Sequence, residues 1–190
     1  MSVHHRVFCR SKKWSRKLRT EVLPWTLDGV RLGSKILEIG PGAGRGTEIL
    51  AQHASSIVAV ECDRRWIGAL RSRLDCTGVR VVAGDATRLP FQNFSFSAVV
   101  SIMVLHHVSP DSAQDELLRE AFRVIEPGGV FVGVDGLVDK VKSRLVHHGD
   151  FVTPLDHRSL PERLSAAGYV SIRVEVGSSK FRFRAYRSWS

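Results

Sequence analysis

The stretch ILEIGPGAG at residues 36–44 decides the fold of this chain. Its first half is a short apolar run of the kind that forms a buried strand. Its second half places glycine at every second position, at Gly40, Gly42 and Gly44, and a helical stretch begins at the third. Glycine permits positive φ angles and lets a ligand approach the backbone without a Cβ atom in the way. The stretch therefore predicts a strand, a glycine turn and a helix that open a ligand site.

Downstream of residue 35, short apolar strands alternate with helical stretches, which is typical of a parallel sheet whose strands are joined by helices. The expected strands are Ile36–Ile39, Ile57–Val60, Val79–Val82, Ala98–Met103 and Val130–Val134. The expected helices are Gly44–His53, Arg64–Leu74 and Ala113–Ile125. The last helix runs into Glu126-Pro127-Gly128-Gly129, a sequence that predicts a stop and a turn.

The last part of the chain has a different pattern. Leu160–Ala167 is expected to be helical, and Tyr169–Val176 and Phe181–Tyr186 alternate apolar with polar residues. Such alternation on both sides of a short connection predicts an antiparallel hairpin. The predicted fold class is therefore α/β: a single doubly wound, mostly parallel seven-stranded sheet with helices on both faces and a C-terminal antiparallel hairpin.

Composition and charge fit one domain with basic ends. Of the 190 residues 43% are hydrophobic, which is enough for one core, and no apolar run approaches the ~18 residues needed to cross a bilayer. The net charge is +9, but residues 1–20 carry seven Lys/Arg and residues 180–190 carry four, neither with an acid, so the remaining 159 residues are close to neutral. Three cysteines without a C-x-x-C pair favour a reducing, cytoplasmic setting.

The glycine spacing separates two classes of nucleotide site. A dinucleotide fingerprint has the spacing G-x-G-x-x-G. Counted from Gly40 the third glycine position holds Arg45, and counted from Gly42 it holds Thr47. The pattern here is instead Glu-x-Gly-x-Gly-x-Gly, starting at Glu38. The spacing, and the lack of a second substrate-binding domain, disfavour an NAD-dependent protein.

Two further carboxylates follow successive strands. Glu61 ends the second predicted strand and could accept hydrogen bonds from both hydroxyls of a ribose. Asp85 follows the third, within Gly84-Asp85-Ala86, and could accept from an adenine amino group. Ligands of open α/β sheets bind at the carboxyl ends of the strands. Glu38, the glycines, Glu61 and Asp85 together predict a site for an adenosine-containing ligand.

Five motifs in order resemble those of the class I (Rossmann-like) S-adenosylmethionine-dependent methyltransferases, over residues 35–136. They are ILEIGPGAG (36–44), VAVECD (58–63), GDATRLPF (84–91), FSAVVSIMVLHHV (96–108) and RVIEPGG (123–129). They are most similar to the small-molecule branch that includes ubiquinone- and menaquinone-biosynthesis methyltransferases. The resemblance implies S-adenosylmethionine as cofactor and S-adenosylhomocysteine as product. The chain is expected to consist of a basic helical lead-in, 1–34, and a cofactor-binding domain, 35–190.

The same resemblance implies a role for each matched residue. Glu38 and Gly40 are expected near the methionine amino group, Gly42 and Gly44 line the loop, and Glu61 holds the ribose. Asp85 and Ala86 are expected to read the adenine, and Ser101 and Met103 to border the transferable methyl. Cys62 is placed with the cofactor-binding residues, although Cys62 and the bulky Trp66 are unusual after the ribose acid.

Methyl transfer is an in-line displacement, and an oxygen or nitrogen acceptor can also need a general base. Candidates are His106 and His107 after the fourth strand, Asp135 at the end of the fifth, and the group His147, His148 and Asp150. For the first two histidines the alternative is a pocket rim. For the last group the alternatives are a substrate lid and a plain surface loop. A metal site is not expected, because adjacent histidines point apart and no fourth ligand is evident.

Residues 11–23 predict an amphipathic helix with a basic outer face, ended by Pro24. It is expected to pack on its own sheet as a lid over the cofactor, with dimerisation as the alternative, so the protein is a monomer or a homodimer.

The predicted function is methyl transfer to an unidentified small-molecule acceptor, with no membrane partner. One alternative is an RNA methyltransferase that contacts phosphates through its basic ends. Against it, Ser101-Ile102-Met103-Val104 stands where adenine-N6 rRNA methyltransferases carry an Asn/Asp-Pro-Pro-Tyr type of motif. A second alternative is a nucleotide-binding protein without methyl transfer.

Overall fold

The first predicted strand lies inside a seven-stranded sheet with the order β3-β2-β1-β4-β5-β7-β6. A computed structural model describes residues 9–137 and 153–190. The strands are β1 (Lys35–Ile39), β2 (Ser56–Glu61), β3 (Arg80–Ala83), β4 (Phe96–Ile102), β5 (Ile125–Gly136), β6 (Val170–Val176) and β7 (Lys180–Tyr186). The neighbours β3–β2, β2–β1, β1–β4 and β4–β5 pair in parallel, and β7 pairs antiparallel with both β5 and β6. The predicted parallel sheet with a terminal hairpin is confirmed.

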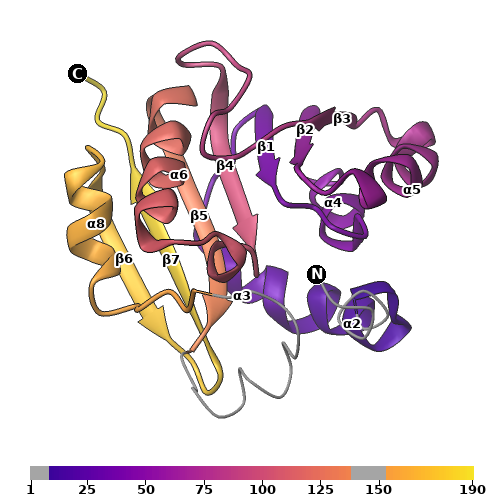
Figure 1. Cartoon of the computed structure of the whole chain (residues 1–190), viewed down its shortest axis with the longest axis horizontal. Helices are drawn as coiled ribbons and strands as arrows, with labels where there is room; N and C mark the ends of the chain where they lie inside the picture. The colour runs from indigo at the N-terminus through magenta and orange to yellow at the C-terminus, as the bar shows by residue number, and fades with distance from the viewer. Residues whose placement is uncertain (1–8, 138–152) are drawn as a thin grey trace.

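Helices cover both faces of this sheet, as predicted (Figure 1). The helical elements are α2 (Lys12–Lys17), η1 (Leu18–Val22), α3 (Leu23–Leu27), α4 (Arg45–Leu50), α5 (Arg64–Leu74), η2 (Asp75–Thr77), η3 (Leu105–His107), α6 (Asp111–Val124) and α8 (Leu160–Ala166). Successive strand residues point to opposite faces. On β4, Val99 joins the cluster that contains α6 and α8, whereas Ala98 and Val100 join the cluster that contains η1, α3 and α4.

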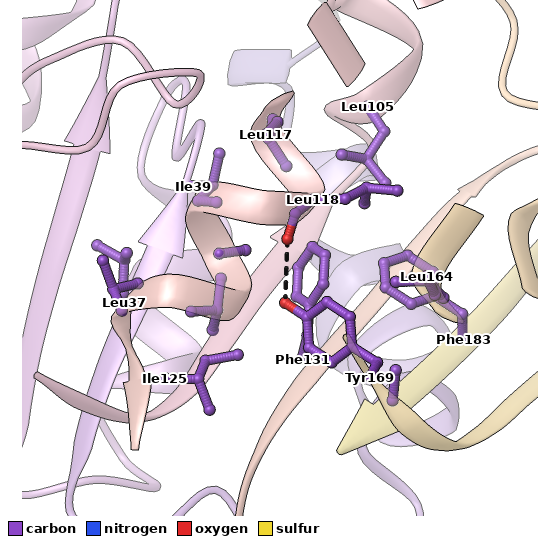
Figure 2. Close-up of a cluster of buried hydrophobic side chains, with 14 of the residues drawn as sticks. Leu37, Ile39, Leu105, Leu117, Leu118, Ile125, Phe131, Leu164, Tyr169 and Phe183 are labelled. Carbon is purple, nitrogen blue, oxygen red and sulfur yellow. Dashed lines mark hydrogen bonds between the residues drawn. The ribbon is translucent and has the colours of Figure 1, made fainter. Parts of the chain in front are cut away.

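The larger cluster lies between the sheet and the pair α6 and α8 (Figure 2). Leu117 and Leu118 of α6 pack there on strand residues such as Phe131. The Phe131 ring meets the Phe183 ring edge to face, with centroids 5.0 Å apart. Tyr169 is buried with them, and its hydroxyl donates to the Leu118 carbonyl at 3.4 Å, the dashed line in Figure 2. The C-terminal hairpin is therefore part of the core.

The N-terminal helix does not end at Pro24. The described chain continues from α2 through the π-helical turn η1 into α3, where Pro24 occupies the first turn. Proline interrupts a helix because it lacks an N–H group and its ring clashes with the carbonyl four residues before it. A π turn changes the spacing of the carbonyl groups just before the proline, so the chain stays helical. The side chains of Leu18, Val22 and Leu23 pack on the sheet, as expected for this segment.

The predicted stop before Glu126-Pro127-Gly128-Gly129 is confirmed, since α6 ends at Val124, but the four residues belong to β5 and do not form a turn. Phe96 of β4 pairs with Ile125 and Ala98 pairs with Val130, so the extra residues of β5 form a bulge. Gly128 has a φ of +77°, and its N–H donates to the Arg187 carbonyl at 3.2 Å. The strand therefore begins directly after α6.

The carboxyl ends of the parallel strands meet at one edge of the sheet, the lower edge in Figure 1, where α2, α3 and η3 also lie. We call it the carboxyl edge. No helix among the described residues is long and apolar enough to cross a membrane.

Candidate active site at the carboxyl edge

The carboxyl edge brings the predicted site residues together from five strands. Glu38 is in β1, followed by the glycine turn 40–44; Glu61 ends β2 and Asp85 follows β3; Ser101 is in β4, followed by η3; and Asp135 is near the end of β5. His147, His148 and Asp150 lie outside the described residues. The described residues contain no group of three or more His, Cys, Asp and Glu that could hold a metal ion.

The three glycines of the turn have different roles, although all have positive φ. A Cβ atom on Gly40 would lie 2.7 Å from Val104, and one on Gly44 would lie 3.1 Å from Leu70 of α5, so these two permit close packing. A Cβ atom on Gly42 would meet nothing within 4 Å among the described residues. Of the three, Gly42 is the one that faces open space where a ligand could lie.

Glu61 joins the end of β2 to this turn. Its Oε2 accepts from the Gly42 N–H at 3.0 Å and its Oε1 accepts from the Asp63 N–H at 2.9 Å. Burial raises the pKa of Glu61, and these two backbone N–H groups oppose the rise. Partial burial, followed by the charges of Glu61 and Asp85, raises the pKa of the Cys62 thiol. Both carboxylates therefore lie close enough to the Cys62 thiol to affect its charge.

Asp85 is exposed after β3, and its Oδ1 accepts from the N–H and the hydroxyl of Thr87, both at 2.9 Å. These bonds fix its orientation. Ala86 beside it packs on the edge of the larger cluster. Ser101, in contrast, is fully buried in β4 between Ile39 and Gly133, and its hydroxyl has no hydrogen-bond partner among the described residues.

Glu38 is a buried acid directly beneath the glycine turn. It is 2% exposed, and its Oε2 has no hydrogen-bond partner among the described residues. A Cβ atom on Gly46 would lie 3.1 Å from Glu38 Oε1, so only glycine at 46 lets α4 approach the acid this closely. Burial raises the pKa of Glu38 to about 7, with Thr47 opposing and the Glu61 charge adding to the rise.

Sequence reasoning missed Gly46 and Thr47, which line the Glu38 site. Gly46 could have been noticed in the sequence, because glycine inside a predicted helix is unfavourable unless a neighbour needs the space. Nothing in the sequence distinguishes Thr47 from any other threonine in a helix.

Replacing Glu38 by glutamine should remove a pH-dependent loss of stability. Below the ordinary pKa of 4.5 the acid is protonated in both states, and between 4.5 and about 7 it is charged only in the unfolded chain. The free energy of unfolding of the unliganded wild type should therefore fall relative to Glu38→Gln as the pH rises through this window, by roughly 3 kcal/mol.

Urea unfolding of both proteins at about pH 4.5 and 7.5 measures this difference. Glu126→Gln, at an exposed position, is the matched control and should show no such change. Parallel pH dependence of wild type and Glu38→Gln would contradict the prediction.

His106 and Asp135 form a buried pair where β4 and β5 end. His106 Nδ1 lies 2.5 Å from Asp135 Oδ1, and the His106 backbone N–H donates to Oδ2 at 3.2 Å. The Gly136 N–H also donates to Oδ1, at 2.6 Å, and Asp135 is 0% exposed. The fold thus joins two of the three candidate catalytic residues. The third, His107, lies beside them, with its ring centroid 4.1 Å from that of His106.

The N-terminal segment begins next to the glycine turn. The Arg10 guanidinium lies over the Trp66 ring, 5.0 Å from its centroid, and the Arg10 carbonyl accepts from Arg45 Nη2 at 3.5 Å. Cys9 packs against the cluster that includes Ala43 of the turn. These contacts place Cys9 and Arg10 beside the glycine turn, and the role of the segment as a lid stays a prediction.

Comparison with known proteins gives related curated proteins with different acceptors in their names. Demethylmenaquinone methyltransferase of Beutenbergia cavernae is 38% identical over 110 residues, which is 56% of this chain and 43% of that protein. Probable tRNA methyltransferase 9B of Bos taurus is 28% identical over 170 residues, which is 88% of this chain and 34% of that protein. The chain spans less than half the length of both relatives.

Two solved structures show the same fold. PH0226 protein from Pyrococcus horikoshii OT3 has a TM-score of 0.83 at 17% identity, covering 99% of this chain and 100% of that one. The N-methyltransferase NodS from Bradyrhizobium japonicum WM9, in complex with S-adenosylhomocysteine, has a TM-score of 0.72 at 20% identity, covering 95% and 90%. The family described as "Methyltransferase domain" matches residues 37–133, a range that holds the glycine turn, Glu61 and Asp85. The chain therefore belongs to the class I S-adenosylmethionine-dependent methyltransferases.

Proposed function

We propose that this protein transfers a methyl group to an oxygen or nitrogen of a small molecule, with His106 as general base. The observation that carries the proposal is the buried His106–Asp135 pair at the carboxyl edge, with His106 Nδ1 2.5 Å from Asp135 Oδ1. A nucleophile that carries a proton must lose it when it is methylated, and a positioned imidazole can accept it. Hydroxyl, carboxyl and amine acceptors meet this description.

The cofactor supplies a methyl group that is already activated for displacement, and the chain has to hold it. We assign the ribose hydroxyls to Glu61 and the adenine amino group to Asp85. The open space at Gly42 supports this placement, since it adjoins the Glu61 carboxylate. Glu38 is assigned to the methionine amino group. Its Oε2 is buried and has no hydrogen-bond partner in the part of the chain that the structure describes, which supports the assignment, because an ammonium would stabilise the charged form of this acid.

Asp135 determines which nitrogen of His106 can accept a proton. A carboxylate accepts hydrogen bonds, so Asp135 holds the His106 proton on Nδ1. Nε2 then carries the lone pair, and it is the nitrogen that would take the proton of the acceptor. Three hydrogen bonds hold the Asp135 carboxylate, including two from backbone N–H groups, and they keep the ring orientation fixed. His107 lines the rim beside the base.

An acceptor panel tests the proposal. Production of S-adenosylhomocysteine is measured with small phenols, carboxylic acids and amines, each paired with an analogue that is already methylated at the reacting atom. Turnover with one class of proton-bearing acceptor, and none with its methylated analogue, is the expected result. Calorimetry with S-adenosylhomocysteine should give about 1:1 binding. No binding by the folded protein would exclude the cofactor site.

A second candidate function is methylation of RNA. The tRNA methyltransferase relative matches 88% of the chain, and α2 with the turn after it exposes Lys12, Lys13, Arg16 and Arg19. The C-terminal arginines do not extend this surface. Arg182 donates to the Trp25 carbonyl and pairs with Glu175, and Arg187 donates to the Phe122 carbonyl at 2.8 Å. Among the described residues, the exposed basic side chains of the N-terminal helix are therefore the candidates for RNA contacts.

Fluorescence anisotropy with labelled tRNA at several salt concentrations tests this second candidate. RNA binding through the helix predicts an affinity that falls with salt and a shallower slope for Lys12→Glu/Lys13→Glu. Arg119→Glu, an exposed position on α6, is the control. Equal binding by wild type and the helix variant would remove RNA as the acceptor bound by this surface.

A further inference from the structure

Gln114 is a fully buried polar side chain in the first turns of α6 that the proposed reaction does not use. It is 0% exposed, and its Nε2 donates to three backbone carbonyls: Leu105 at 3.1 Å, Val108 at 3.2 Å and Thr153 at 2.8 Å. The first two carbonyls belong to residues on either side of His106. The third belongs to a segment that lies far along the chain.

The contacts of Gln114 also determine which way its amide points. Arg163 of α8 donates from Nη1 to Gln114 Oε1 at 3.0 Å, so the oxygen faces the guanidinium and the nitrogen faces the carbonyls. Arg163 is held in turn by Asp115, at 2.6 Å, and by the Asp111 carbonyl, at 3.0 Å. Only a side chain with both an acceptor and an N–H donor group satisfies this arrangement.

Hydrogen bonds therefore hold the backbone both before and after His106. The His106 N–H donates to Asp135, and the His106 carbonyl accepts from the Thr153 N–H at 2.9 Å. Gln114 binds the carbonyl of Leu105, just before His106, and that of Thr153 itself. Without Gln114, the carbonyls of Leu105, Val108 and Thr153 would each lose a donor; Leu105 would keep the Val108 N–H at 3.0 Å, and a group left without a partner costs about 1–3 kcal/mol.

We infer that Gln114, oriented by Arg163, is a positioning residue that holds the η3 turn so that His106 meets Asp135. The inference rests on the proposed role of His106. It goes further because it assigns the orientation of His106 to two residues that the proposed cofactor and base assignments do not use. Arg163 lies 49 positions from Gln114 in the sequence, so α8 takes part in holding the base.

Proton NMR tests the inference without an acceptor. A proton held between His106 Nδ1 and the Asp135 carboxylate gives a strongly deshielded resonance, assigned by its loss in Asp135→Asn. Gln114→Glu keeps the shape of the side chain but replaces the N–H donors by an oxygen. We expect it to speed exchange of this proton with water at least about tenfold, the equivalent of one lost hydrogen bond of about 1.4 kcal/mol.

The matched control is Arg123→Gln at the other end of α6. Arg123 also holds a turn by its carbonyls, binding those of Leu89 at 3.0 Å and Phe91 at 2.8 Å. Arg123→Gln should lower the midpoint of thermal unfolding but leave the exchange of the His106 proton unchanged. An equal exchange increase in Arg123→Gln would mean general loosening and would overturn the inference.

The remaining outcomes separate the positioning role from the base itself. Wild-type exchange in a folded Gln114→Glu protein overturns the positioning role and leaves the His106–Asp135 pair standing. A wild type without the Asp135-dependent resonance overturns both. If Gln114→Glu does not fold, Arg163→Gln takes its place, since it removes the group that orients Gln114 and leaves the Gln114 donors present. Faster exchange in that variant supports the inference, and unchanged exchange contradicts it.

Discussion

Replacing His106 by asparagine should lower methyl transfer about 10²–10⁴-fold while leaving S-adenosylhomocysteine binding nearly unchanged. A general base contributes a factor of this size when it removes a proton in the transition state. Asparagine keeps a polar side chain near Asp135 but has no basic nitrogen. The initial rate of S-adenosylhomocysteine production with the acceptor found in the panel, together with calorimetry, measures the two quantities separately.

Asp135→Asn should lower the rate by a similar factor, because a carboxamide can present its N–H to the ring and stabilise the wrong tautomer. The dependence of the rate on pH distinguishes a general base from a structural role of His106. The part of the pH–rate profile that reports the titration of the base should disappear in His106→Asn. His53→Asn is the control, at an exposed histidine that precedes β2 at the opposite edge of the sheet. A wild-type rate in His106→Asn would exclude the base.

Replacing Glu61 by alanine should weaken binding of S-adenosylhomocysteine at least about 100-fold, or about 3 kcal/mol. Hydrogen bonds to a charged group contribute about 1.5–3 kcal/mol each, and two ribose hydroxyls are assigned to this carboxylate. The same change also leaves the Gly42 N–H without its acceptor, so the glycine turn loses an anchor. Calorimetry at constant pH and salt gives the dissociation constants.

Glu61→Gln refines this result, because its amide oxygen can keep one bond of the turn but it carries no charge. Its affinity should lie between those of wild type and Glu61→Ala. Glu126→Ala, exposed in the β5 bulge, removes a carboxylate of the same kind far from the site and should bind like wild type. If Glu61→Ala is folded and binds as tightly as wild type, the ribose is not held by this residue.

Much of the fold was predictable because its signals are local. Short apolar runs predicted the five parallel strands, and alternation of apolar with polar residues predicted the two strands of the hairpin. The glycine turn predicted the order strand, turn and helix at β1. Two local predictions failed where a neighbouring element changed the outcome. Pro24 did not end its helix because a π turn precedes it, and residues 126–129 became a strand bulge because β4 and the C-terminal segment pair with them.

The candidate site divides in the same way. The carboxylates Glu38, Glu61 and Asp85 were predicted together, because each follows or ends its own strand and parallel strands end at one edge. The pairing of His106 with Asp135 was not predicted, since 29 positions separate the two residues. Both had been named only as separate candidates, and no pattern in the sequence distinguishes a bonded pair from two independent residues.

The sequence by itself determined that a glycine turn follows a central strand, that acidic side chains stand at the ends of neighbouring strands, and hence that the chain binds an adenosine-containing cofactor. These properties follow from local spacing: the glycines lie within one strand-turn-helix unit, and each acidic residue lies near the end of its own strand. Only the tertiary structure decided which of the three glycines faces open space, which nitrogen of His106 is held by Asp135, and that Gln114 and Arg163 hold the turn between them. The reason is physical: these properties depend on side-chain packing between elements far apart in the sequence, and such packing is set only when the sheet and its helices have come together.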